Sequence, residues 1–221
     1  IDLIDLNPWQ TARPGKLEKM PAISTDQPTS HIELDALGCI WLHEGNLLHR
    51  IAFNHAGDIE SIHSLHHDGL QKSNLIFKDI EQKGNVWINL NGQICSIGLQ
   101  EEGKLQAMPV ADCLNFAPDL LLSDFIVKEH EIWITTNQGL YRYDKNHNIV
   151  KHYEHIPGNP NTLSQNFLTG LAVTENKQLI VTSLCGINIY NPLADNFEQI
   201  RNYLPGDKPP LLNSNFVNCI T

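Results

Sequence analysis

Short apolar runs alternate along this chain with polar turns, and residues 131–144 show the pattern most clearly. Two pieces rich in β-branched and aromatic residues flank a polar turn that ends in Gly139. Such a pattern is typical of a tight antiparallel hairpin. No segment shows the 3.6-residue apolar period of an amphipathic helix, so the pattern predicts an all-β chain.

The hairpin phrase recurs at equal intervals. A turn, an aliphatic residue, tryptophan and a second aliphatic residue occur around Trp41, Trp87 and Trp133. In a fourth copy, Ile180 takes the tryptophan position. The intervals are 46 residues (41 to 87), 46 residues (87 to 133) and 47 residues (133 to 180). A period of this size indicates an array of one supersecondary unit.

Each copy extends the hairpin by one strand on either side. Apolar runs at residues 75–77 and 125–127 precede the tryptophan strand, and extended pieces at residues 149–153 and 197–203 follow the hairpin. Four short antiparallel strands cannot bury both faces of their sheet alone, and stacking such sheets around an axis solves that problem. We therefore predict β-propeller blades, in which the tryptophans pack between blades and have no catalytic or cofactor role.

The turn before each tryptophan strand carries Gly38 and Gly84 in the first two copies. A residue with positive φ suits this turn, which explains the glycines. His130 and Lys177 stand at the same place in the other copies, and we expect them to adopt that backbone at some cost in strain.

The period also predicts the domain organisation: one β-propeller fragment over residues 1–221, with about four to five blades. Whole blades are expected at residues 26–70, 71–116, 117–162 and 163–210, with the end of a preceding blade at 1–25 and the start of a further blade at 211–221. The N-terminus reads as a cut end, so we expect a piece of a longer propeller, as an open arc or an oddly closed ring. Exposed sheet edges would favour self-association.

Charge narrows the possible functions. The chain has 25 acidic and 15 basic side chains, a formal net charge of −10, and no run of lysine or arginine. Nucleic-acid binding by this chain is therefore not expected. No apolar stretch approaches the roughly 20 residues that span a bilayer, so no membrane contact by this chain is expected either.

Candidate chemical sites are few. The five cysteines are widely spaced without a Cys-x-x-Cys pair, which argues against a disulfide framework and a zinc site. In a strand His63 and His67 would share a face, but no matching ligand recurs in other copies, so His63, His66 and His67 are expected to be solvated loop histidines. Glu101 and Glu102 form a hairpin tip with carboxylates on opposite sides. We predict no catalytic residue, no cofactor and no metal, and the sequence assigns no ligand-binding residue.

Two phrases together resemble the two-component regulator propeller repeat. They are Asn159-Pro160-Asn161-Thr162-Leu163-Ser164-Gln165-Asn166 and the hairpin phrase of residues 132–144. The resemblance covers essentially the whole chain and is strongest over residues 131–215. The family commonly has glycine two residues after the tryptophan, where this chain has His43, Asn89, Thr135 and Thr182.

The resemblance implies the sensor region of a hybrid two-component system of Bacteroidetes, in the periplasmic part of an inner-membrane protein. Such proteins carry two propellers of about seven blades each, an immunoglobulin-like segment, a membrane helix, a histidine kinase, a receiver and a DNA-binding domain. The implied ligand is an oligosaccharide, and the implied output is control of glycan-utilisation genes. This chain would then be a sensor and not an enzyme.

Two other functions stay open. A propeller lyase or hydrolase would gather histidine and acidic side chains at one mouth of the ring. A protein-binding scaffold would present a broad exposed apolar patch in place of a small concave pocket.

Overall fold

The computed structural model describes residues 29–73, 76–79, 82–117, 120–201, 212 and 214–218. The expectation that residues 1–25 end a preceding blade lies outside this part of the chain.

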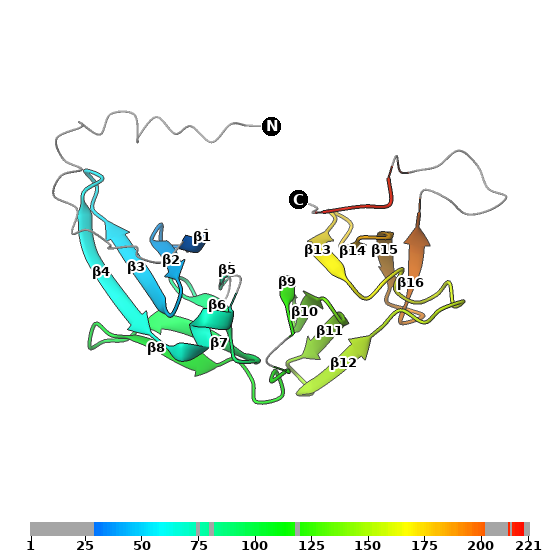
Figure 1. Cartoon of the computed structure of the whole chain (residues 1–221), viewed down its shortest axis with the longest axis horizontal. Helices are drawn as coiled ribbons and strands as arrows, with labels where there is room; N and C mark the ends of the chain where they lie inside the picture. Colours follow the sequence, from blue (N-terminus) through cyan, green and yellow to red (C-terminus); the bar gives the residue numbers. More distant parts are fainter. Residues whose placement is uncertain are drawn as a thin grey trace. The chain divides into compact units, whose positions relative to one another are not determined.

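The described residues form four sheets of four antiparallel strands, and within each sheet the strands lie side by side in chain order (Figure 1). This architecture confirms the predicted all-β fold of four-stranded propeller blades. Sheet A comprises β1 (Thr29–Leu34), β2 (Ile40–Glu44), β3 (Leu47–Phe53) and β4 (Ile59–His66). Sheet B comprises β5 (Ile76–Lys78), β6 (Val86–Leu90), β7 (Gln93–Leu99) and β8 (Leu105–Pro109). Sheet C comprises β9 (Leu122–Lys128), β10 (Glu131–Thr136), β11 (Gly139–Asp144) and β12 (Ile149–Tyr153). Sheet D comprises β13 (Leu168–Val173), β14 (Leu179–Ser183), β15 (Gly186–Asn191) and β16 (Asn196–Ile200).

The sheets group into two compact units. The first unit contains sheet A and sheet B except for the first two residues of β7. The second contains sheets C and D together with residues 91–94 and 110–117. Each unit has its own apolar core between its two sheets. Trp41 lies in the first core and Trp133 in the second, with 0% and 1% of their surfaces exposed. Their predicted role as packing residues is confirmed.

The turns before the tryptophan strands follow the prediction in three copies and differ in one. Gly38, Gly84 and Lys177 have positive φ angles of 81°, 86° and 61°. In sheet C the prediction for His130 was wrong, because Glu129 takes the left-handed conformation, with φ 58°. The β9–β10 turn is tighter there, since Lys128 pairs directly with Glu131, and this moves the strained position one residue earlier.

The glycines that close the second hairpin of sheets C and D have a steric reason as well as a conformational one. Gly139 and Gly186 have φ angles of 115° and 116°. A Cβ atom at either position would collide with the carbonyl oxygen of Tyr153 or Ile200, at the end of the adjacent outer strand. No side chain fits, so these hairpins require glycine.

The connections from sheet A to sheet B and from sheet C to sheet D lie outside the strands. The first contains the short 3-10 helix η2 (Asp68–Lys72). The longer one, residues 154–167, is tied to sheet D through Asn161, whose carbonyl accepts from Phe197 N at 3.1 Å, and through Ser164, whose N donates to Asn188 Oδ1 at 2.7 Å. These bonds hold the connection against the sheet that it enters.

Candidate functional site

The buried indole N–H groups of three sheets each donate to a carboxylate. A buried indole needs such a partner, because an unpaired N–H in a core costs free energy. The Nε1–oxygen distances are 2.9 Å for Trp41 and Asp35, 2.7 Å for Trp87 and Asp79, and 3.0 Å for Trp133 and Glu131.

The same carboxylates bind the residue that stands nine positions after each tryptophan. Asp35 pairs with Arg50 at 3.5 Å, Asp79 accepts from Ser96 at 3.2 Å, and Glu131 pairs with Arg142 at 2.8 Å. Each arginine lies directly opposite its tryptophan in the strand register. In sheet D, Ile180 faces Ile189 instead, so the tryptophan and its ion pair are absent together. Sequence reasoning missed this unit, although the repeated spacing of tryptophan and arginine was a usable signal.

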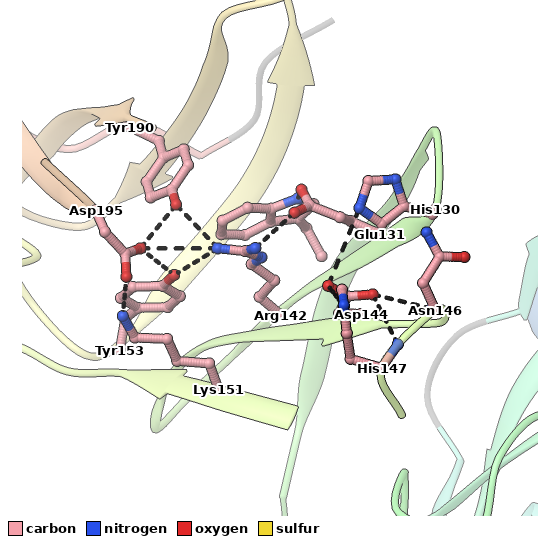
Figure 2. Close-up of polar contacts among 11 residues, drawn as sticks. His130, Glu131, Arg142, Asp144, Asn146, His147, Lys151, Tyr153, Tyr190 and Asp195 are labelled. Atoms are coloured by element: carbon pink, nitrogen blue, oxygen red, sulfur yellow. Dashed lines mark hydrogen bonds and ion pairs between the residues drawn. The ribbon is translucent and has the colours of Figure 1, made fainter. Parts of the chain in front are cut away.

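A polar network joins sheets C and D around Asp195, in the β15–β16 turn (Figure 2). Its Oδ1 accepts from the hydroxyls of Tyr153 at 2.6 Å and Tyr190 at 2.7 Å, and its Oδ2 pairs with Lys151. Arg142 Nη1 lies 3.1 Å from the Tyr190 hydroxyl and 3.8 Å from Asp195 Oδ1. One carboxylate therefore gathers donors from both sheets.

Aromatic rings pack beneath this network. Trp133 lies 5.8 Å from Tyr153 in a stacked arrangement and 4.7 Å from Tyr190 edge-on, and Phe197 lies 5.4 Å from both tyrosines. All four side chains are buried. Because their faces are covered by one another, these rings offer no platform on which a ligand could stack.

The charges of the network are fixed by its own bonds. Burial alone would raise the pKa of Asp195, but hydrogen bonds from Lys151, Tyr153 and Tyr190 outweigh it and lower the pKa. Burial, with the bond to Asp195, raises the pKa of Tyr153 far above its ordinary value. Ionised aspartate and neutral tyrosine are thus the states at neutral pH, and the network serves to hold two sheets together.

Asp195 has an equivalent in sheet C. Asn148 also precedes an outer strand, and the two residues have φ angles of 54° and 51°. Asn148 Oδ1 accepts from the Tyr143 hydroxyl at 3.1 Å, as Asp195 accepts from Tyr190. The turn therefore needs an asparagine or aspartate that tolerates positive φ, and the negative charge is specific to the junction of sheets C and D.

The histidines singled out in the sequence contact separate partners. The prediction that His63 and His66 are loop residues was wrong, since both belong to β4. His63 Nδ1 lies 2.9 Å from Gly103 O, and His66 Nε2 lies 2.7 Å from Asn46 Nδ2. His67 lies beyond the strand and caps η2. Among the described residues, no three His, Cys, Asp or Glu side chains are grouped so that they could hold a metal ion.

Glu101 and Glu102 occupy the β7–β8 turn, which Gln100 N closes on Lys104 O at 2.9 Å. The predicted hairpin tip is confirmed. Their nearest described cationic partner is Lys104, 3.8 Å from Glu102, and all of these side chains are exposed.

Asp124, in the inner strand of sheet C, is a second carboxylate at the junction with sheet D. Its Oδ2 accepts from Leu171 N of β13 at 2.9 Å, and its Oδ1 accepts from Phe125 N at 2.8 Å. Burial raises the pKa of Asp124, and these two backbone bonds lower it only in part. The junction thus carries one carboxylate with a raised pKa and one, Asp195, with a lowered pKa.

The two edges of sheets C and D differ in charge. At one edge, where Leu122 pairs with Thr136 and Leu168 with Ser183, residues 120–123, 136–139, 164–169, 183–186 and 214–218 include no charged side chain. We call these residues the uncharged rim. Charges return directly after β12 and β16, at Glu154 and Arg201. Arg201 Nη2 donates to Ser164 O of the rim at 3.0 Å. The turns of the opposite edge, at residues 128–131, 144–148, 174–178 and 191–196, carry Lys128, Glu129, Glu131, Asp144, Lys145, Glu175, Lys177 and Asp195.

Three apolar side chains are exposed on the uncharged rim. Leu121 and Phe167 directly precede the inner strands β9 and β13, with exposed fractions of 47% and 44%. Phe216 is 58% exposed and precedes Val217, whose N donates to Ser183 O at 3.3 Å. The same position of the repeat is therefore exposed and apolar in each case.

No family model matches the sequence. No curated protein matches it either.

Solved structures do match the fold. The extracellular domain of the putative hybrid two-component system BT4673 from B. thetaiotaomicron superposes with a TM-score of 0.58 at 16% identity, over 82% of this chain and 22% of that one. The corresponding domain of BT3049 from the same organism gives 0.52 at 21% identity, over 80% and 23%. Virginiamycin B lyase from Staphylococcus aureus gives 0.52 at 15% identity, over 83% and 58%.

These likenesses establish the fold that the repeat phrases predicted, that of the extracellular domains of Bacteroidetes hybrid two-component systems. The chain spans less than a quarter of the length of those extracellular domains. Within the described residues, no helix is both long and apolar enough to cross a membrane.

Proposed function

We propose that this chain is part of the extracytoplasmic sensor region of a hybrid two-component regulator, that it binds an oligosaccharide, and that binding controls glycan-utilisation genes. The observation that carries the proposal is the agreement of two independent lines. The repeat phrases resemble the regulator propeller family, and the fold matches two sensor domains of that class of system. A periplasmic position in an inner-membrane protein follows from the same reasoning.

In this role the chain contributes binding and not catalysis. A ligand that favours one arrangement of the sensor would shift a two-state equilibrium and so alter the output of the attached kinase. Titration calorimetry of the chain against a panel of oligosaccharides tests the binding step. A saturable heat with at least one glycan is expected, and flat heats throughout would count against it.

A lyase is the second candidate, because virginiamycin B lyase shares the fold. Among the described residues, no three His, Cys, Asp or Glu side chains could hold a metal ion. Asp144 has His147 at 2.8 Å and His130 at 4.0 Å. Incubation of the chain with glycans and with a streptogramin, followed by mass spectrometry, should show unchanged substrate, and any turnover would favour the enzyme.

The third candidate, a protein-binding scaffold, would use a broad apolar patch.

Self-association of the chain through its sheet edges is proposed alongside the sensor role. Light scattering should show species larger than a monomer as the protein concentration rises. A strictly monomeric chain at high concentration would contradict self-association.

A further inference from the structure

We propose that the uncharged rim of sheets C and D binds a neutral oligosaccharide. This inference rests on the proposed sensor function and adds two things to it: the position of the site and the class of glycan.

The side chains of the rim have the chemistry that sugars require. Phe167 and Phe216 expose aromatic rings, which can cover the apolar face of a sugar ring. In the β10–β11 turn the Oδ1 of Asn137 already accepts from Leu121 N at 3.0 Å, whereas the side chain of Gln138 is exposed. An amide both donates and accepts hydrogen bonds, so it can match the hydroxyl groups of a sugar.

Side-chain hydrogen bonds close the turns of the rim, which favours binding. Thr136 Oγ1 donates to Gly139 O at 2.8 Å and accepts from Gln138 N at 3.0 Å. Ser183 repeats both bonds in sheet D, donating to Gly186 O at 3.2 Å and accepting from Cys185 N at 3.0 Å. The hydroxyls are consumed in fixing the backbone, so residues at the turn tips are held in place before a ligand arrives. Such preorganisation lowers the entropic cost of binding.

Charge decides between neutral and acidic glycans. A uronic acid or sulfate group is normally bound by arginine or lysine through charge-assisted hydrogen bonds. The rim residues themselves include neither, and the adjacent Arg201 already donates from Nη2 to Ser164 O at 3.0 Å. The chain as a whole has a net charge of −10. An acidic glycan would therefore be repelled by the chain as a whole, and the guanidinium of Arg201 beside the rim is already bonded to the backbone.

The turns at the opposite edge of the same sheets are charged, so the absence of charge is specific to the rim. Its turns carry charges of both signs, of which Lys177 and Glu129 pair at 3.5 Å and Asp144 accepts from His147 at 2.8 Å (Figure 2). Leu193, at its β15–β16 turn, is 98% exposed, and this provides a matched control for truncation of an exposed apolar residue.

The test is calorimetry of the 221-residue chain against neutral gluco-, manno-, xylo-, galacto- and fructo-oligosaccharides and against oligogalacturonate and sulfated chondroitin oligosaccharides. One neutral glycan should bind. Phe167→Ala should weaken it about tenfold, as expected for loss of one stacked ring, and Gln138→Glu should weaken it by several-fold. Phe167→Tyr, which keeps the ring, and Leu193→Ala should bind as the parent chain does.

The outcomes separate this inference from the function on which it rests. Binding of acidic glycans alone would overturn the inference and leave the sensor function standing. Neutral-glycan binding that Phe167→Ala and Gln138→Glu leave unchanged would also overturn it. Flat heats with every glycan would overturn both. Circular dichroism and melting curves verify that Phe167→Ala is folded, and Gln138→Glu, at an exposed position, tests the rim again if it is not.

Discussion

Between sheets A and B the core is mainly aliphatic around Trp41, whereas between sheets C and D it is aromatic, with Trp133, Tyr153, Tyr190 and Phe197. One position shows the change. Ile97 and Tyr190 stand ten residues after the tryptophan position of their copies. The tyrosine brings a hydroxyl into the interface, and that hydroxyl requires a partner, which Asp195 supplies.

The difference alters how each unit supports its ion pair. Asp35 and Arg50 are almost fully buried, with side chains 0% and 9% exposed, and Arg50 Nε makes no hydrogen bond. Arg142 is 25% exposed and is shared among Glu131, two tyrosines and Asp195. Removing one partner of a single buried ion pair is strongly destabilising, because the other charge stays buried without a counter-charge. A network with several acceptors can lose one of them at lower cost.

The largest expected effect comes from breaking the buried pair. Asp35→Ala should destabilise the first unit by about 3 to 5 kcal/mol, because it strands the Arg50 charge and leaves the Trp41 N–H unpaired. Glu131→Ala in the second unit should cost about 1 to 2 kcal/mol, since Arg142 keeps other partners and some solvent. Hydrogen exchange of peptides from β2–β3 and β10–β11 measures the two local stabilities. Equal losses of stability in the two units would mean that the network around Arg142 tolerates the loss of a carboxylate no better than the single pair of Asp35 and Arg50.

A smaller loss should follow Asp195→Asn. Asparagine fits the turn, as Asn148 does at φ 54°, so the change removes charge and preserves the backbone. We expect a loss of about 1 kcal/mol at low salt, reduced for the partial exposure of Asp195, and less at high salt because the pairs with Lys151 and Arg142 are screened. Exchange in β15–β16 reports it, with Asp144→Asn as a carboxylate control in the neighbouring turn. A loss that salt does not reduce would mean that charge is not the cause.

The turns before the tryptophan strands allow a reciprocal exchange between the units. Gly38→Ala should cost about 1 kcal/mol, because no atom obstructs the new Cβ and only the positive φ opposes it. Lys177→Gly should give a gain of about 0.5 kcal/mol by relieving the same strain, partly offset by the greater freedom of unfolded glycine. Thermal melts of both variants measure the pair, and a stabilised Gly38→Ala would contradict the conformational argument.

The sequence predicted the repeat well because each feature of it is local. Hairpin turns ending in glycine and apolar strands of fixed spacing depend on neighbouring residues alone. The partners of the tryptophans were not predictable in this way. Asp35 and Asp79 precede their tryptophans by six and eight residues, and Glu131 by two, because the turns between the strands differ in length. Asp195 binds residues more than 40 positions away, and no single-sequence pattern connects them.

The smallest expected effect concerns Asp124, which contrasts with Asp195 at the same junction. The raised pKa of Asp124 means that its contribution to stability is full below the unfolded value of about 3.9 and is lost as pH rises through the folded pKa. Asp195 behaves oppositely, because its lowered pKa gives stability above about pH 3.9 that is lost as pH falls. Asp124→Asn keeps an acceptor for Leu171 N without a buried charge, although it weakens the bond from Phe125 N.

At pH 7 we therefore expect Asp124→Asn to be as stable as the parent chain or more stable by less than about 1 kcal/mol, whereas Asp195→Asn is less stable. Both differences should shrink toward pH 3, where the two carboxyl groups are increasingly protonated. Denaturant titrations at pH 3, 5 and 7, followed by exchange in β9 and β13, measure this. A clear loss of stability at pH 7 for Asp124→Asn would show that the ionised carboxylate strengthens the inner-strand contact, and would make the two ends of the junction alike.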